Sequence, residues 1–322
     1  MDKLNIKDIQ KFKTLNYHTS YIMCILILND GRLASSSDDC SIIIYEKNTF
    51  LPEIEILDFD TPINNIIQLS NNYLVSACAD GKITVIKLIS NTEYKIISSL
   101  LYHNFSVNRI IELNEYEFAS GSDDQTVKIF KKYDNYDKIY QCTMTLANLS
   151  APIEAIIYCK KLNEIILAPY KEQNLQFWNL LFYQKICYLN NIYFEGFQNS
   201  LVMINDYILG VGVFAGLNLI DLKTHNIFKR IKIVGGVLNV IKKNNFLFTN
   251  GVFKGNNNSI IKWEIKDNEI IKIGEKHKLI NENNEHNNHN HNHLERLILL
   301  KVFDDGKIVI ATSENKIELW KN

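Results

Sequence analysis

Short apolar stretches and polar turns alternate along the whole chain, and the alternation comes back as a repeated unit. Each unit contains a turn, a short apolar strand, a polar turn and a second strand that ends on a large apolar residue. Seven closing residues occur, at intervals of 41, 44, 48, 42, 43 and 57 residues: Tyr45, Ile86, Phe130, Trp178, Ile220, Trp263 and Trp320. This spacing brackets the period of four-stranded propeller blades. The pattern therefore predicts an all-β fold, a seven-bladed β-propeller of four-stranded antiparallel blades.

Three of the units share a histidine that lies 27 residues before the closing residue. These histidines are His18, His103 and His293. An apolar residue follows each of them four positions later and opens a strand whose side chains alternate between two faces. Because the spacing recurs three times, we interpret the histidine as part of the repeat.

At these residues the chain resembles the WD-repeat β-propeller family, whose repeats run from a Gly-His pair to a Trp-Asp pair. The resemblance covers essentially the whole chain and implies a buried, hydrogen-bonded tetrad of His, Ser, Asp and Trp. The matching positions are His18, Ser35 and Asp39 in the first blade and His103, Ser120 and Asp124 in the third. Tyr45 and Phe130 replace the Trp. Since Phe has no hydrogen-bond donor, the third network should be one bond short.

The other blades depart further from the family pattern. The second keeps Ser76 and Asp80 but has Phe59 at the His position, while the seventh has Ile310 and Glu314 between its His and its Trp. Blades four to six keep less. We expect these blades to depend on apolar packing against their neighbours.

The ends of the chain indicate how the ring closes. The sequence ends at Asn322, two residues past Trp320, which leaves nothing for an outer strand of the seventh blade. An uncovered strand edge invites aggregation. The segment from Ile9 to Leu15 is strand-like, and the resemblance implies that such a strand completes the last blade. We therefore predict one propeller domain, residues 1–322, closed by its N-terminal strand.

Composition narrows the range of partners. The net charge is −1 and the lysines are scattered, whereas nucleic-acid binding needs clustered Lys and Arg, so we expect no nucleic acid as main partner. The longest strongly apolar run, residues 21–28, is far below the roughly 18 residues that span a bilayer, and the start lacks an apolar stretch of signal-peptide length. We therefore expect no membrane partner. The six cysteines include no close pair, so we also expect reduced thiols and a cytoplasmic or nuclear location.

Three features invite a reading as chemical centres. Residues 281–292 are rich in Asn and His and could hold a metal, but such sequence cannot form a core, so we predict a disordered loop between blades six and seven. Residues 210–216 look like a loosened dinucleotide motif, but strand-like residues follow where a helix is needed. His103, Ser120 and Asp124 resemble a catalytic triad on paper, yet a tetrad buries its hydroxyl. We predict no catalytic residue, metal or cofactor.

The resemblance implies that partners meet the face formed by the loops around the first strand and the tight turn of each blade. Positions beside the first apolar residue of that strand, and before the turn acid, should point there. The candidates are Tyr21, Met23, Asp38, Asn64, Asn108, Asp123, Glu154, Arg296 and Ile298. The set contains a Tyr and an Arg, which are enriched in interface hot spots.

The function class implied is a non-enzymatic scaffold or adaptor for other proteins, a monomeric propeller within a hetero-complex. One alternative is a hydrolase similar to the diphthine methylesterase branch of the family, which needs an exposed nucleophile with a base beside it. Another is a reader of peptides or modified histones, which needs an aromatic cage, and Tyr21 is the evident candidate for it. The sequence does not choose a pathway, because fold does not imply function.

Overall fold

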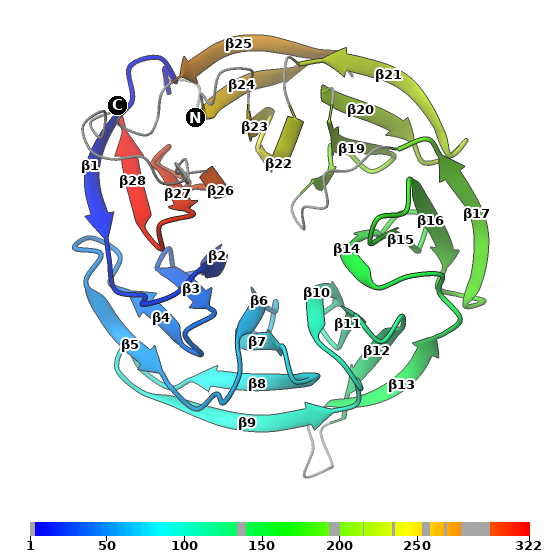
Figure 1. Cartoon of the computed structure of the whole chain (residues 1–322), viewed down its shortest axis with the longest axis horizontal. Coiled ribbons are helices and arrows are strands. Elements are labelled where there is room, and N and C mark those ends of the chain that lie inside the picture. Colours follow the sequence, from blue (N-terminus) through cyan, green and yellow to red (C-terminus); the bar gives the residue numbers. More distant parts are fainter. Residues whose placement is uncertain are drawn as a thin grey trace, which may run out of the picture.

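The chain folds into a ring of blades. The structure is a computed structural model that describes residues 4–133, 140–192, 200–214, 216–233, 236–252, 258–266, 269–277 and 297–322. These residues form 28 strands in seven four-stranded antiparallel sheets arranged around a common axis (Figure 1). The predicted all-β, seven-bladed fold is confirmed. Within the described ranges, no helix is long and apolar enough to cross a membrane.

Each blade is built outward from the ring axis. The inner strands are β2 (Ile22–Ile27), β6 (Ile63–Gln68), β10 (Val107–Asn114), β14 (Ile153–Cys159), β18 (Leu201–Met203), β22 (Gly236–Lys243) and β26 (Leu297–Val302). The second strands are β3 (Leu33–Ser37), β7 (Tyr73–Cys78), β11 (Glu117–Ser122), β15 (Glu164–Pro169), β19 (Ile208–Val213), β23 (Phe246–Val252) and β27 (Ile308–Thr312).

The closing residues of the sequence repeats lie on the third strands of the blades. These are β4 (Ile42–Tyr45), β8 (Lys82–Leu88), β12 (Val127–Lys132), β16 (Asn174–Asn179), β20 (Gly216–Asp221), β24 (Asn258–Lys266) and β28 (Ile317–Lys321). The outer strands are β5 (Pro52–Ile56), β9 (Tyr94–Leu101), β13 (Tyr140–Leu146), β17 (Gln184–Asn190), β21 (Asn226–Lys232), β25 (Glu269–His277) and β1 (Gln10–Leu15). Every closing residue named from the sequence lies on a third strand, so the predicted register is confirmed.

Apolar side chains fill the space between neighbouring blades. In the described part of the chain they form seven buried clusters, one at each blade junction. The junction of blades four and five, for example, contains Phe177, Val211 and Ile220, all fully buried. Burying a Val, Leu, Ile or Phe side chain contributes about 1.5–3 kcal/mol. The blades with weak sequence signals are therefore held by the packing that we expected for them.

The N-terminal strand closes the ring as predicted. Strand β1 pairs antiparallel with β28, with Gln10 opposite Lys321 and Leu15 opposite Ile317 (Figure 1). An ion pair of 2.7 Å between Lys11 Nζ and Glu318 Oε1 adds a side-chain contact across the two strands.

The residues before β1 also pack, which the sequence did not indicate. Leu4, Ile6 and Ile9 are at most 8% exposed and belong to the cluster between blades six and seven. The buried Lys262 Nζ donates a hydrogen bond of 2.9 Å to the backbone oxygen of Leu4. The N-terminal segment thus joins the last two blades as well as completing the last sheet.

The ring has two faces that differ in the loops that form them. The entry face consists of the loops that lead into the inner strands and the turns between second and third strands. The opposite face consists of the turns between first and second and between third and fourth strands. On the entry face, Gly81 has a φ of 87°, and a Cβ there would lie 2.5 Å from the backbone oxygen of His103. Glycine therefore lets the blade-two turn lie against the loop before β10.

Candidate functional site

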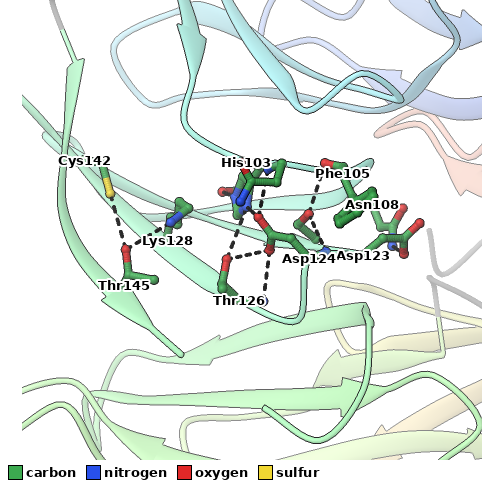
Figure 2. Close-up of polar contacts among 12 residues, drawn as sticks. His103, Phe105, Asn108, Asp123, Asp124, Thr126, Lys128, Cys142 and Thr145 are labelled. Carbon is green, nitrogen blue, oxygen red and sulfur yellow. Dashed lines mark hydrogen bonds and ion pairs between the residues drawn. The ribbon is translucent and has the colours of Figure 1, made fainter. Parts of the chain in front are cut away.

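A buried polar network lies in blade three, under the entry face (Figure 2). A hydrogen bond of 2.7 Å joins His103 Nε2 and Ser120 Oγ, and one of 2.8 Å joins His103 Nδ1 and Asp124 Oδ2. Asp124 also accepts hydrogen bonds from the Thr126 hydroxyl at 2.6 Å and from the backbone N–H of Asn104 at 3.1 Å. The geometry joins a loop, a strand and a turn through one imidazole.

Blade one repeats the arrangement and adds a bond. His18 contacts Ser35 Oγ at 2.7 Å and Asp39 Oδ2 at 2.8 Å, and the Tyr45 hydroxyl lies 3.0 Å from Ser35 Oγ. The Tyr45 hydroxyl thus does what the indole of the family's Trp is implied to do. Phe130 has no group for this contact in blade three, as its chemistry requires.

Burial decides the charge state of these networks. It lowers the pKa of His18 and of His103, although Asp39 and Asp124 act in the other direction, so both imidazoles are neutral at neutral pH. For Asp124, burial raises the pKa, but hydrogen bonds from Thr126 and the contacts with His103 outweigh it and leave the pKa lowered. The carboxylate is therefore ionised beside a neutral imidazole.

The same burial excludes these serines as nucleophiles in this conformation. Ser35 and Ser120 are each 0% exposed, and His103 is 2% exposed. A triad is defined by access and geometry rather than by residue type, and no substrate can reach these hydroxyls. The networks are structural.

What the networks do is hold the loops of the entry face. In blade three, Ser122 Oγ donates to the backbone oxygen of Phe105 at 3.1 Å, and the backbone N–H of Asp123 donates to Ser106 O at 2.9 Å. Blade one has the matching contact from Asp38 N–H to Tyr21 O, also at 2.9 Å. Asp38 and Asp123 are thereby placed on the entry face by backbone hydrogen bonds.

Blade six keeps half a network that sequence reasoning missed. Trp263 Nε1 donates to Thr249 Oγ1 at 3.0 Å in the interior of the blade. The pairing of β23 with β24 places Thr249 where Ser35 stands in blade one. The sequence pattern did not reveal Thr249 for two reasons. Thr replaces Ser, and Thr249 lies 14 residues before its closing residue rather than 10.

In blade two the corresponding residues do not form the polar network. The Asp80 carboxylate pairs with Lys82 at 2.8 Å, while Phe59, at the His position, packs against the apolar cluster between blades one and two. Ser76 is fully buried, and its hydroxyl contacts the backbone oxygen of Thr84 at 3.5 Å. An apolar contact has replaced the polar one.

A bulge near the start of the inner strands orients several of the predicted partner-binding residues. Register shifts place Met23, Asn64, Asn108 and Glu154 at this bulge in blades one to four. A bulge turns a side chain away from the regular alternation. Asn108 uses it to donate to Ile153 O at 3.2 Å and to Asp123 Oδ1 at 2.7 Å, so it joins blade three to blade four.

Asn64 differs from the expectation of an exposed position. It is 8% exposed, and its amide donates to Val107 O at 2.9 Å and to Ser106 Oγ at 2.7 Å. Because both contacts lie within the chain, this side chain joins blades two and three and does not face solvent.

The remaining candidates vary in exposure. Tyr21 is 54% exposed, Asp123 is exposed, and Met23, Asp38, Asn108 and Glu154 are partly exposed. Arg296, the loop 281–292 and His293 lie outside the described residues. The backbone of Ile298 belongs to β26, but its side chain is not among those that the structure describes.

Glu154 is unlike the other polar bulge residues. It occupies the position at which Asn64 and Asn108 join blades, yet its carboxylate makes no hydrogen bond within the described residues. Burial raises its pKa to about 7, the Asp123 carboxylate adds to the rise, and Lys171 opposes it. Tyr170, 40% exposed, belongs to the turn of the same blade. Glu154 is thus a half-buried acid beside a second acid at the edge of the entry face.

The other features singled out in the sequence form no chemical centre in the part that the structure describes. Gly210 and Gly216 lie on the antiparallel strands β19 and β20, so a strand follows the second glycine where a dinucleotide motif needs a helix. All six cysteines are free thiols. The described residues bring together no group of three His, Cys, Asp or Glu side chains that could hold a metal.

Comparison with known proteins adds one finding. Residues 9–46 match the family described as WD domain, G-beta repeat. This stretch contains β1, which closes the ring, and the first three strands of blade one. No curated protein matches the chain.

Proposed function

Since the chain belongs to the WD-repeat β-propellers, we propose that it is a non-enzymatic scaffold that binds another protein through the entry face of blades one to four. Propellers of this family are typically platforms for protein interactions.

Glu154 is the observation that carries the proposal. A half-buried carboxylate without a hydrogen bond in the described structure costs stability, because burial removes water from its charge. Asn at the same position in blades two and three makes contacts within the chain instead. Residues that cost stability in a fold tend to serve function. This supports our proposal that Glu154 accepts a hydrogen bond from a partner.

The surroundings of Glu154 define the chemistry of that donor. Asp123 lies beside it and is held by Asn108, and Asp38 on blade one has its pKa raised by burial and by Asp39. A partner's Arg or Lys would relieve the repulsion between Glu154 and Asp123. Tyr21 and Tyr170 are exposed aromatic residues of the kind that anchor interfaces. We infer a partner segment with a basic side chain next to an apolar one.

The alternatives gain less support. The hydrolase needs an exposed nucleophile beside a base, whereas the serines that contact His18 and His103 are buried. A reader of methylated lysine needs a cage, and Tyr21 makes no ring contact with a second aromatic residue in the described structure. We propose a location in the cytoplasm or nucleus, where free cysteines such as the six of this chain are typical. We also propose that the chain is one propeller of a hetero-complex, because propellers of this family typically bind other proteins.

The test is affinity purification of the tagged full chain from its own cells, with partners identified by mass spectrometry. We expect a reproducible, stoichiometric partner set that is lost or reduced at least about tenfold in the double variant Asp123→Asn, Glu154→Gln. The matched control is Glu93→Gln, Glu115→Gln, which removes two exposed carboxylates from the opposite face and should keep the partners.

The proposal fails if the Asp123/Glu154 variant recovers the same partners in the same amounts as the wild type. It also fails if the control variant loses them equally, since the face would then not matter.

A further inference from the structure

A second candidate surface lies on the opposite face, away from the proposed scaffold site. A cavity of about 850 Å³ opens there between blades five and six, beside the turn of residues 204–207 and the turn after β20. Tyr207, Ile208 and Phe228 supply its apolar walls. Phe228 is 49% exposed although its ring is large and apolar. The cavity is large enough for several side chains of a ligand.

Two lysines at the rim of this cavity have no acidic partner in the described structure. Lys223 Nζ lies 4.0 Å from the centre of the Tyr207 ring, and Lys242 is exposed and forms no ion pair with a described residue. The neighbouring Lys243 differs, because it pairs with Asp304 at 2.6 Å. Two ammonium groups beside the apolar walls of this cavity thus remain available to a ligand.

The acids that line the same cavity already have contacts within the chain. Asp221 accepts a hydrogen bond of 2.9 Å from the backbone N–H of Lys223. The Asp206 carboxylate lies 3.9 Å from Lys161 Nζ, on blade four. Asp221 thus fixes the turn after β20 through a backbone contact and keeps its charge, whereas Asp206 is partly balanced by Lys161.

We propose that this groove binds a short acidic segment of a partner protein, with a large apolar side chain seated between Tyr207 and Phe228 and carboxylates paired with Lys223 and Lys242. Charge complementarity favours the acid, because Lys223 and Lys242 form no ion pair with a described residue, whereas Asp206 at the rim lies 3.9 Å from Lys161 Nζ. The apolar walls select the neighbouring residue, since burying a large side chain there removes exposed apolar surface from water. The exposed rim fits an extended peptide better than an enclosed small molecule.

The test uses a phage-displayed library of random peptides, panned on the full chain and counter-selected on the double variant Lys223→Glu, Lys242→Glu. We expect enriched sequences with Asp or Glu next to Phe, Leu, Ile or Trp. A synthetic peptide of the enriched sequence should bind the double variant at least about tenfold more weakly, and Phe228→Ala should also weaken it. Lys95→Glu, the same reversal of charge at a single lysine on the outer strand of blade two, should leave the Kd within about twofold.

Each other outcome overturns the proposal. Enrichment of basic or purely apolar sequences, no enrichment, or equal binding by the double variant and the Lys95→Glu control would show that the lysines select no acidic segment. Light scattering on the same samples covers one more case: a dimer that Lys223→Glu, Lys242→Glu disperses would assign the groove to a second copy of the chain. Asp123→Asn, Glu154→Gln should not change peptide binding, so this result is independent of the entry-face proposal.

Discussion

Blades three and five are both four-stranded antiparallel sheets, but blade three has a buried polar network where blade five has buried apolar side chains. Blade three holds the network of His103, Ser120 and Asp124, whereas blade five has the buried Val211 and Ile220 at the serine and closing positions. Both blades complete the ring. The polar network is therefore not what makes a blade. What it adds is a fixed loop and turn on the entry face, where the partner-binding candidates lie.

The comparison separates stability from function. Packing between blades gives the ring its stability, and it does so at every junction. The polar networks lie in blades one and three, next to Asp38 and Asp123. A buried network that is fully satisfied orders the groups around it. We expect these two networks to hold the entry face of blades one and three in one conformation.

The largest expected effect comes from removing residues 1–15, which should unfold both blades together. The deletion takes away β1 and the buried Leu4, Ile6, Ile9 and Leu15, each worth about 1.5–3 kcal/mol. The product should be insoluble or should melt at least about 10 °C lower by calorimetry. Melting within a degree or two of the full chain would contradict the closure. Ile6→Ala with Ile9→Ala, which keeps β1, should have an intermediate effect.

Next in size are matched substitutions in the two interiors. Ser120→Ala should cost about 1–3 kcal/mol by leaving His103 Nε2 without its partner, and Val211→Ala should cost a similar amount by opening a cavity. Hydrogen exchange should separate them. Only Ser120→Ala should speed exchange at residues 103–106 and 122–126. Equal loosening of that loop by Val211→Ala would remove the distinction between the blades.

Blade six offers an intermediate case. Thr249→Val keeps the shape of the side chain but removes the acceptor for Trp263 Nε1, so we expect a loss of about 1–2 kcal/mol in denaturant unfolding. Thr84→Val, a buried threonine of blade two, serves as the control. If Thr249→Val is neutral, the half network contributes nothing and blade six belongs with blade five.

The smallest effect is a gain. Glu154 has its pKa raised by burial to about 7, so its ionisation destabilises the fold as the pH rises from its ordinary value of 4.5 through 7. Glu154→Gln should therefore raise the Tm at pH 8, by less than about 2 °C, and should leave it unchanged at pH 4.5. Asp123→Asn should give a smaller gain of the same sign. A lower Tm at pH 8 would show that Glu154 stabilises the ring.

Much of the fold could be predicted from spacing alone. Repeats report on strand order, so all seven closing residues and the closing strand were placed correctly. The docking of Leu4 and Ile6 could not be predicted, because nothing in a short N-terminal segment says which distant blade it meets. Thr249 was missed because a change of residue type and a longer hairpin broke the pattern together.

Predicting the site was harder than predicting the fold. The spacing of the repeats located the bulge positions on the entry face. The exposure of each side chain, however, depends on the neighbouring blade, and the Asn64 amide donates both of its hydrogen bonds to blade three. Spacing gave no hint of the groove. Tyr207, Lys223 and Lys242 come from three separate turns and strand ends, and each looks like an ordinary surface residue until the ring brings them together.

The most direct measurement is hydrogen exchange on the full chain, alone and in complex with the partner recovered from its own cells. We predict slower exchange on binding at residues 104–108, 122–126 and 153–155, which surround Asn108, Asp123 and Glu154. Protection confined to residues 203–208 and 222–228 would show that the scaffold binds through the opposite face and would contradict the central claim.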